Sequence, residues 1–340
     1  MSKENSTFLI TGGTGSFGMA AVKHLSEIEQ AFPEDIKEIR VFSRDETKQN
    51  DMKLINPNKK IKYFIGDVRC SDSMYDAMRG VDYVFHSAAL KAIPSCEKFP
   101  LQATLTNIIG THNVLEVAHR AGVKKCVILS TDKAVYPVSA MGASKFMAEK
   151  IALSDYFFQN DMQVCITRFG NLAGSRGSVI PLFLNQMSRG EPMTLTDPNM
   201  TRFMMTIEEA VDLIMWAFLK GKNGHIYIKK SPAATMGDLV KAVQNIFNYY
   251  NTKIIGPRCG EKAYEGLITT EESVRTTEHD GYFVVAPDEY TERENGTPYF
   301  SNTSQQLSVK ELEGFLMTVE CVRKAKEVLN VAGIGRLEIL

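Results

Sequence analysis

The sequence predicts an α/β fold, a doubly wound parallel sheet with a smaller, interleaved C-terminal lobe. Two observations predict it. Short apolar, β-branched runs alternate with amphipathic helical patterns through the first two-thirds of the 340 residues, and continuous apolar strands are typical of a parallel sheet covered on both faces. A glycine-rich segment also separates the first apolar run from the first helical pattern, which is where open α/β sheets begin their ligand site.

The elements follow one another in a regular order. The predicted strands are Phe8–Ile10, Glu38–Phe42, Lys62–Ile65, Tyr83–His86, Cys126–Leu129, Val164–Phe169 and His225–Ile228. The predicted helices are Ser16–Glu29, Asp45–Ile55, Ser71–Met78, Gln102–Ala121, Ala140–Phe158 and Ile207–Leu219. Because helices alternate with strands, neighbouring strands are expected to run parallel, with helices packed on both sides of the sheet.

Turn signals multiply after Asn171 and indicate a second part of the chain. We expect residues 1–170 to form the core, with 205–230 returning to it. Residues 171–204 and 231–340 then form the lobe and a C-terminal extension. The stretch 276–304 lacks periodicity and predicts a loop-rich lid or an arm against a neighbouring subunit. A final helix is expected over Ser308–Leu329, because Ser308 and Glu311 have the spacing of a capping box.

Composition excludes several classes of protein. The 39 basic and 40 acidic residues give a net charge of −1, which argues against nucleic-acid binding. No apolar run approaches the roughly 20 residues of a membrane span, and the polar N-terminal residues do not predict a secretory leader. The six cysteines are scattered, so a reducing cytoplasmic location is expected. The six histidines show no ligand spacing, and no metal is expected.

The glycine-rich segment Thr11–Gly18 predicts a phosphate-binding turn. Gly12 and Gly15 permit a tight turn and close approach of the main chain to a diphosphate, and Gly18 permits close packing of helix on strand. The helix start then faces the anion. A plain turn is the alternative. The expected cofactor-binding residues here are Gly12, Thr14, Gly15, Ser16, Phe17 and Gly18.

The ends of the second and third strands indicate the cofactor. Ser43 and Arg44 stand where an acidic residue would select NAD, and Lys48 follows one turn later. A guanidinium suits a 2′-phosphate, so NADP is favoured over NAD. Asp67 and Val68 end the third strand, and Asp67 could accept a hydrogen bond from the adenine amino group. The alternative is that Arg44 is a solvated charge and Asp45 caps a helix.

Candidate catalytic residues follow the fifth strand. Thr131, Asp132 and Lys133 come directly after it, at the sheet edge where ligands bind in such folds. Met141 and Lys145 lie four residues apart and therefore share a helix face. An acid beside a potential base suits proton transfer next to hydride transfer. An exposed ion pair in a turn is the alternative interpretation of Asp132 and Lys133.

These motifs resemble the extended short-chain dehydrogenase/reductases, whose Tyr-x-x-x-Lys signature would be represented by Met141 and Lys145. Within that group the chain is similar, over nearly its whole length, to bacterial UDP-N-acetylglucosamine 4,6-dehydratases, above all to the 5-inverting enzymes of the capsular polysaccharide branch. The similar stretches are 42–46, 65–69, 88–91, 130–134, 136–141, 174–181, 196–198 and 200–203.

The resemblance implies further ligand contacts. Ala88, Ala89 and Lys145 would contact NADP, and Asn171 would contact the diphosphate of UDP-N-acetylglucosamine. It also implies a homo-oligomer, with a hexamer as one candidate. The expected substrate-binding residues are Lys91, Asn171, Val179, Ile180, Pro181, Thr194, Arg202, Arg258 and Glu261.

The resemblance also implies a reaction in three steps. Oxidation at C4 acidifies the C5 proton, Lys133 removes it while Asp132 protonates the leaving C6 hydroxyl, and then hydride returns to C6 and a proton returns to C5. The product would be UDP-2-acetamido-2,6-dideoxy-β-L-arabino-hex-4-ulose, for surface polysaccharide or glycan synthesis. A base role predicts that burial and Lys145 lower the pKa of Lys133. Met141 cannot transfer a proton, so Thr131 or Tyr136 is expected to take the C4 hydroxyl proton.

Three alternatives remain open at this point. A C5-retaining 4,6-dehydratase would use the same residues. A UDP-N-acetylhexosamine 4-epimerase shares the fold, the cofactor and the C4 oxidation, but does not need the acid–base pair of Asp132 and Lys133. A catalytically silent NADP-binding regulator could keep the glycine segment without keeping both Lys133 and Lys145.

Overall fold

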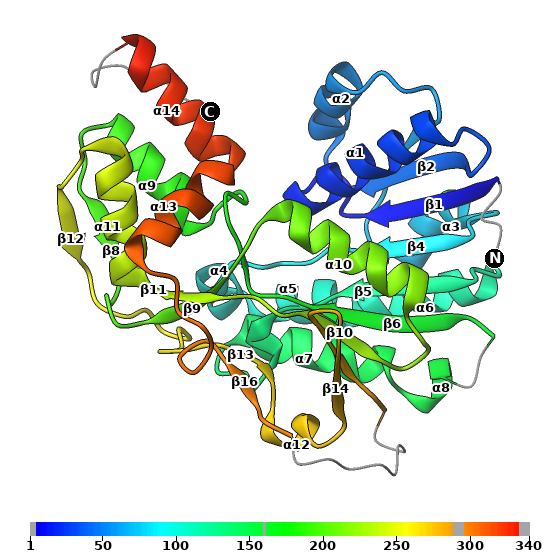
Figure 1. Ribbon diagram of the computed structural model, residues 1–340. Helices are drawn as coiled ribbons and strands as arrows, with labels where there is room; N and C mark the ends of the chain where they lie inside the picture. Colours follow the sequence, from blue (N-terminus) through cyan, green and yellow to red (C-terminus); the bar gives the residue numbers. More distant parts are fainter. Residues whose placement is uncertain (1–4, 159–160, 288–295, 333–340) are drawn as a thin grey trace.

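A central sheet organises the chain in the computed structural model, which describes residues 5–158, 161–287 and 296–332 (Figure 1). Nine strands of these ranges form it. In sheet order they are β14 (Thr276–His279), β15 (Tyr282–Val285), β10 (Ile226–Lys229), β6 (Gln163–Arg168), β5 (Lys125–Leu129), β4 (Tyr83–His86), β1 (Ser6–Thr11), β2 (Ile36–Ser43) and β3 (Ile61–Ile65).

The strand order reverses between β1 and β4. The chain runs outward from β1 through β2 to β3 on one side, and through β4, β5, β6 and β10 on the other, with all these neighbours parallel. The predicted doubly wound parallel sheet is therefore confirmed. A crevice forms where the connections diverge, at the carboxyl ends of the strands, and this is where the candidate site lies.

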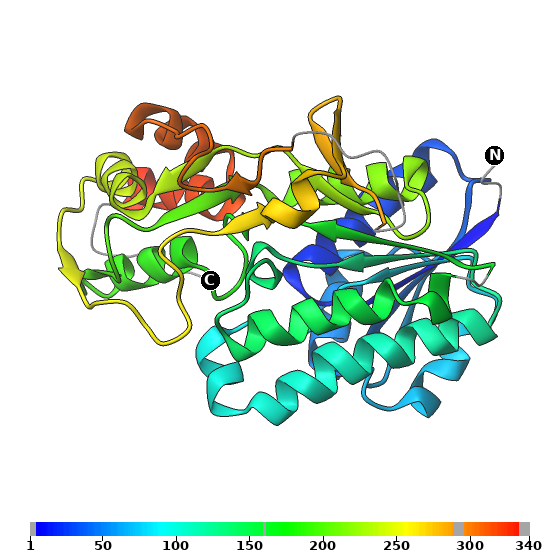
Figure 2. The same cartoon turned by 90° about the horizontal axis from the view of Figure 1, so that it is seen from below.

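Helices cover both faces of the sheet, as Figure 2 shows from below. Buried apolar residues of α1 (Ser16–Ala31) and α10 (Ile207–Lys220) form a core against one face of the sheet. The other face packs against α3 (Tyr75–Met78), α6 (Gly110–Arg120) and α7 (Ala140–Ala152). The other α-helices of this part of the chain are α2 (Glu46–Ile55), α4 (Ile93–Lys98), α5 (Pro100–Ala103) and α8 (Asp155–Phe158).

Two predicted helices are interrupted. The helix expected over Gln102–Ala121 consists of α5, a π-helical segment η2 (Thr104–Ile109) and α6. The helix expected over Ser308–Leu329 does begin at a capping box of Ser308 and Glu311. It ends at Val319, whose extended main chain (ψ 120°) separates α13 (Val309–Thr318) from α14 (Glu320–Ala332). Gly110 stands at the boundary between η2 and α6, whereas no glycine or proline marks the break at Val319.

The lobe lies beside the carboxyl edge of the sheet (Figure 1). It has its own apolar core. Residues of α9, α11, α13 and α14 supply much of it. The elements of this part of the chain are β7 (Asn171–Leu172), α9 (Val179–Ser188), β8 (Met193–Leu195), β9 (Thr201–Met205), β11 (Ala233–Thr235), α11 (Met236–Phe247), β12 (Thr252–Ile254), β13 (Gly266–Ile268), α12 (Thr270–Ser273) and β16 (Tyr299–Phe300), with α13 and α14.

The stretch 276–304 differs from its prediction. A hairpin of β14 and β15 pairs antiparallel with β10 and extends the central sheet, and β16 pairs with β13. The stretch is thus ordered against its own chain, apart from 288–295, which fall outside the described residues.

The proposed boundaries of core and lobe remain a prediction. No helix in the described ranges is long and apolar enough to cross a membrane.

Candidate active site

A cleft of about 1030 Å³ runs along the carboxyl ends of the parallel strands. Its walls come from the turns after β1, β2, β3 and β4, from the end of β5, from the residues after β6 and from the loop 175–178. Every residue that the sequence assigned to the cofactor lines this cleft. These residues are Gly12, Thr14, Gly15, Ser16, Phe17, Gly18, Ser43, Arg44, Lys48, Asp67, Val68, Ala88, Ala89 and Lys145.

The glycine turn after β1 lies in the middle of the cleft and packs closely against neighbouring main chain. Gly12 has a φ of +66°, and a Cβ there would lie 2.8 Å from the main-chain nitrogen of Ala88. A Cβ on Gly18 would lie 2.5 Å from the Cα of Gly13. The first turn of α1 has no side-chain cap at Gly15, so its N–H groups are available to a ligand. These features fit the diphosphate of a dinucleotide.

Charged side chains surround the far end of the cleft, beyond β2 and β3. The Arg44 guanidinium lies 3.8 Å from the Asp67 carboxylate. Burial by itself would raise the pKa of Asp67, but hydrogen bonds from Arg69 hold that pKa below its ordinary value. Asp45 accepts a hydrogen bond from the Lys48 main chain and caps α2, as the alternative interpretation expected. Arg44 still lines the cleft, with its side chain 55% exposed.

Asp132 and Lys133 form a buried ion pair after β5. Lys133 Nζ lies 3.0 Å from Asp132 Oδ1 and 3.3 Å from Asn171 Oδ1. Asp132 is fully buried, and its Oδ2 has no hydrogen-bond partner among the described residues. A Cβ on Gly170, which lines the cleft, would lie 3.5 Å from that oxygen. The interpretation of the pair as exposed is therefore wrong, and Oδ2 lies just behind the cleft wall.

The predicted electrostatics of Lys133 require a correction. Burial lowers the pKa of Lys133, but the Asp132 and Glu265 carboxylates more than offset this, and its pKa lies above the ordinary value. Burial raises the pKa of Asp132, and the charge of Glu265 raises it further against the opposing effect of Lys133. In this structure Lys133 is thus an ammonium beside a carboxyl group that holds protons unusually well.

Lys145 lies on α7 and lines the same cleft as Lys133. Its Nζ donates a hydrogen bond of 2.6 Å to the carbonyl of Leu129, the last residue of β5. Burial lowers the pKa of Lys145 to about 8, although the Glu149 carboxylate opposes this. A lysine with such a pKa can exchange a proton near neutral pH.

Met141 and Thr131 also line the cleft. Met141 is buried and packs against Cys96 and Ala103, so it contributes apolar contact. Thr131 donates a hydrogen bond of 2.9 Å to Asp132 Oδ1. Tyr136 lies elsewhere: its hydroxyl donates to Glu271 at 2.7 Å, and it does not line the cleft. Thr131 is therefore the better placed of the two expected proton acceptors.

The expected substrate residues fall into two groups. Lys91 and Asn171 line the cleft, and Lys91 Nζ donates to the Arg176 carbonyl at 2.8 Å. The others lie in the lobe and do not line the cleft in this structure: Val179, Ile180, Pro181, Thr194, Arg202, Arg258 and Glu261.

The positions within the lobe explain why these residues lie apart from the cleft. Ile180 is buried in the apolar core of the lobe. Thr194 exchanges hydrogen bonds with Gln186. The Arg258 guanidinium lies 4.0 Å from the Glu261 carboxylate, and Arg202 is buried on β9, where it donates to the Thr201 carbonyl.

The structure adds residues that sequence reasoning did not assign to the site. Arg176 donates to the Thr14 carbonyl at 2.7 Å, and its main-chain N–H donates to Ser16 Oγ, so the loop 175–178 crosses the glycine turn. Glu265 lies 3.5 Å from Lys133. Arg176 belongs to the glycine-rich stretch 174–177, which could have identified it. Glu265 is far away in the sequence and carries no local signal.

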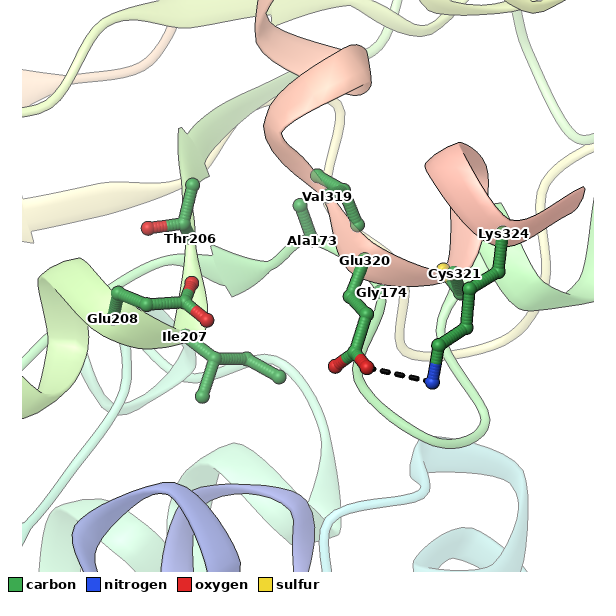
Figure 3. A pocket seen from close by; sticks show the side chains of 9 residues that line it. All are labelled: Ala173, Gly174, Thr206, Ile207, Glu208, Val319, Glu320, Cys321 and Lys324. Atoms are coloured by element: carbon green, nitrogen blue, oxygen red, sulfur yellow. Dashed lines mark ion pairs between the residues drawn. The ribbon is translucent and has the colours of Figure 1, made fainter. Parts of the chain in front are cut away.

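A second pocket, of about 200 Å³, lies at the joint between the lobe and the start of α10 (Figure 3). Glu320 and Lys324 of α14 form a 2.7 Å ion pair beside it. Its lining residues are Ala173, Gly174, Thr206, Ile207, Glu208, Val319, Glu320, Cys321 and Lys324. In neither pocket, nor elsewhere in the described ranges, do three or more His, Cys, Asp or Glu side chains gather as a metal site would require.

The sheet, its switch of strand order and the position of the cleft define a doubly wound, Rossmann-type fold. The profile of a polysaccharide biosynthesis protein family matches residues 8–287, and the chain belongs to that family.

Relatives and solved structures agree with this assignment. The UDP-glucose 4-epimerase of Rickettsia akari is 44% identical, with 94% of this chain and 97% of the relative covered. That of Rickettsia bellii is 45% identical at the same coverage. The X-ray structure of Pen from Bacillus thuringiensis superposes with a TM-score of 0.86 at 36% identity, covering 94% of this chain and all of that one.

A more distant structure shows the same fold. DesIV, a dTDP-glucose 4,6-dehydratase from Streptomyces venezuelae with NAD and TYD bound, has a TM-score of 0.70 at 24% identity. The match covers 76% of this chain and 86% of DesIV. The two curated relatives thus carry the name of a UDP-sugar 4-epimerase, the reaction class of the epimerase alternative, although for UDP-glucose, and not the name of the expected UDP-N-acetylglucosamine dehydratase.

Proposed function

We propose that this protein is a nicotinamide-dependent nucleotide-sugar 4,6-dehydratase that acts on UDP-N-acetylglucosamine. The observation that carries the proposal is the buried pair of Asp132 and Lys133 at the sheet edge. Removing water across C5 and C6 of a sugar needs a base at C5 and an acid at the C6 oxygen, and this pair offers both in adjacent side chains.

The pair works through a proton shift. Lys133 is an ammonium in this structure, so it must first pass a proton from Nζ to Asp132 Oδ1 across 3.0 Å. The neutral amine then accepts the C5 proton, and Asp132 donates its proton to the departing C6 oxygen. Both groups thereby return to their ionic forms. A raised pKa of Asp132 favours this shift, because the protonated acid is already stabilised by burial.

The remaining residues bind and orient the reactants. A bound nicotinamide would supply the removal of hydride from C4 and its return to C6, and a proton exchangeable with solvent would return to C5. Lys145, whose pKa lies near 8, would orient the cofactor ribose and, with Thr131, accept the C4 hydroxyl proton. Asn171 would hold the sugar nucleotide beside Lys133. Met141 would exclude water without exchanging a proton.

The choice of cofactor and nucleotide has separate support. Arg44 lines the cleft where a 2′-phosphate would lie, which supports NADP, while DesIV was solved with NAD. Relatives named for UDP-glucose support a UDP-sugar. The N-acetyl group is supported by the resemblance of the motifs to UDP-N-acetylglucosamine dehydratases, most closely to the 5-inverting enzymes.

A second candidate is 4-epimerisation of a UDP-sugar, which the names of the 44% identical relatives favour. Such a reaction requires C4 oxidation and reduction from the opposite face, but no base at C5. The buried ion pair of Asp132 and Lys133 would then have no step to perform. For this reason the geometry supports dehydration better than epimerisation.

The deciding experiment is incubation with UDP-N-acetylglucosamine, and separately with UDP-glucose, followed by mass spectrometry and proton NMR. Dehydration gives a product that has lost one water, and proton NMR then gives its C5 configuration, inverted or retained. In deuterated water the product should carry deuterium at C5. An unchanged mass with a galacto-configured product would instead establish the epimerase.

Lys133→Ala provides the matching variant, with Lys124→Ala as its control, because Lys124 is an exposed lysine paired with Asp82 far from the cleft. We expect Lys133→Ala to abolish both water loss and deuterium incorporation, and Lys124→Ala to retain them. Survival of both signals in Lys133→Ala would show that another group removes the C5 proton.

A further inference from the structure

Lys262 and Glu265 contact the turn 132–135, which carries the proposed catalytic pair of Asp132 and Lys133. Lys262 Nζ donates to the carbonyl of Val135 at 2.9 Å and lies 3.4 Å from that of Asp132. It also lies 2.7 Å from Glu265 Oε2, while Glu265 Oε1 lies 3.5 Å from Lys133 Nζ. The Glu265 carboxylate therefore faces Lys262 with one oxygen and Lys133 with the other.

The position of Glu265 is fixed by the main chain. Its N–H donates to Ser301 Oγ at 2.9 Å, and its carbonyl accepts a hydrogen bond from the N–H of Ser301 at 2.8 Å. Ser301 is fully buried and bonds in turn to Thr201 of β9 at 2.7 Å. Glu265 itself is only 2% exposed. The Glu265 carboxylate is thus buried, and hydrogen bonds hold the main chain of this residue in place.

The charges around Glu265 come from several elements. Lys133 and Asp132 face it from the turn after β5, Lys262 from the preceding loop, and Arg202 from β9. Three cations therefore share two carboxylates that are almost completely buried. An ion pair with Lys262 alone would satisfy a purely structural role, yet the second oxygen of Glu265 is directed to Lys133.

We propose that Glu265 is a positioning residue that orients the ammonium of Lys133 toward Asp132 and retains the proton that the two share. The inference rests on the proposed function, because that proton is the one exchanged before elimination. Glu265 gains and loses no proton in this scheme. The proton moves between Lys133 Nζ and Asp132 Oδ1. The negative charge of Glu265 beside them determines the pH range over which the pair carries a single proton.

A pH profile follows from this arrangement. The active form of the pair carries one proton, so activity falls at low pH, where the pair holds two, and at high pH, where it holds none. The charge of Glu265 raises the pKa of both members. Glu265→Gln should therefore move both limbs of the kcat/KM profile to lower pH, by about one to two units, as is usual when a charge within 4–6 Å is removed.

The test compares Glu265→Gln, Glu265→Asp and the control Glu278→Gln, which removes an exposed carboxylate on β14 paired with Lys230. Glu265→Asp keeps the negative charge on a shorter side chain. The limbs of its kcat/KM profile should therefore lie between those of the wild type and those of Glu265→Gln. Glu278→Gln should leave both limbs in place. A loss of stability in Glu265→Gln without movement of either limb would overturn the proposal.

A second readout needs no substrate. In protein labelled with ¹³Cε-lysine, the Lys133 signal is identified by its loss in Lys133→Arg, and its titration is followed by NMR. We expect the midpoint of the Lys133 titration to fall by about one pH unit or more in Glu265→Gln. If that variant does not fold, Glu265→Asp takes its place, and a smaller fall of the midpoint is expected. An unmoved midpoint would reject the role of Glu265. A moved midpoint in a protein without dehydratase activity would reject only the proposed function.

Discussion

Arg168 Nη2 lies 2.6 Å from Glu149 Oε2 in an ion pair whose two side chains are 3% and 4% exposed. The same guanidinium reaches Glu272 of α12 at 2.8 Å, and Glu149 also accepts a hydrogen bond from Ser130 beside the cleft. Burial would lower the pKa of Arg168, but the two carboxylates raise it above its ordinary value. This network joins β6, α7 and the C-terminal part of the chain directly behind the candidate site.

Replacing Arg168 with methionine should destabilise the protein strongly, because two buried carboxylates would lose their counterion. We expect the free energy of unfolding to fall by about 3–5 kcal/mol, the usual cost of breaking a buried pair by removing one partner. Urea unfolding measures it. The control is Arg79→Met, whose exposed 3.3 Å pair with Asp76 should contribute less than about 1 kcal/mol. Equal effects of the two substitutions would contradict the expectation.

Much of the fold could be predicted from local patterns. The glycine turn, the strand ends at Ser43 and Asp67, and the segment 131–133 are each signalled within a few residues, since a parallel sheet brings its carboxyl ends to one edge. The hairpin 276–285 was missed because its strands have only four residues each and β14 is polar, so only the short run of β15 is apolar.

The electrostatics of the site could not be predicted in this way. Glu265 reaches Lys133 from a segment about 130 residues later in the chain, and no local pattern announces that contact. Without Glu265, burial was expected to lower the pKa of Lys133, whereas the structure shows it raised. Pairings between distant segments depend on the whole fold, so residue type and spacing do not reveal them.

Arg44→Gln should change the preference between the two nicotinamide cofactors. Arg44 lines the cleft at the end of β2, where a 2′-phosphate would lie. A charge-assisted hydrogen bond contributes about 1.5–3 kcal/mol, so NADPH affinity should fall by about tenfold or more, while NADH affinity stays nearly constant. Fluorescence titration with NADPH and NADH measures both. A similar loss for the two cofactors would show that Arg44 does not contact the 2′-phosphate.

Met141→Leu should retain most of the activity, because the thioether has no proton to transfer. Met141 is buried against Cys96 and Ala103, and a leucine of similar volume should cost less than about 1.5 kcal/mol of stability. The measurement is kcat/KM for UDP-N-acetylglucosamine across pH, together with urea unfolding. A loss of activity well beyond the loss of stability would indicate that the sulfur has a direct role in the reaction.

Lys145 makes the free energy of unfolding depend on pH in the alkaline range. Burial lowers its pKa from an ordinary value of 10.5 to about 8 in the folded protein. Between these values the unfolded chain binds more protons than the folded one, so the contribution of Lys145 to stability rises with pH. Below pH 8 both states carry the proton, and the folded state bears the full cost of the buried charge, on the order of 3 kcal/mol.

Lys145→Met tests this dependence. Relative to the variant, the wild type should gain up to about 3 kcal/mol in the free energy of unfolding from pH 7.5 to 10.5. Urea unfolding across this range measures the difference, and the comparison cancels the titration of other groups. Lys150→Met, an exposed lysine of the same helix, should show no such trend. A difference between wild type and Lys145→Met that is constant over the range would mean that Lys145 keeps an ordinary pKa in the folded protein.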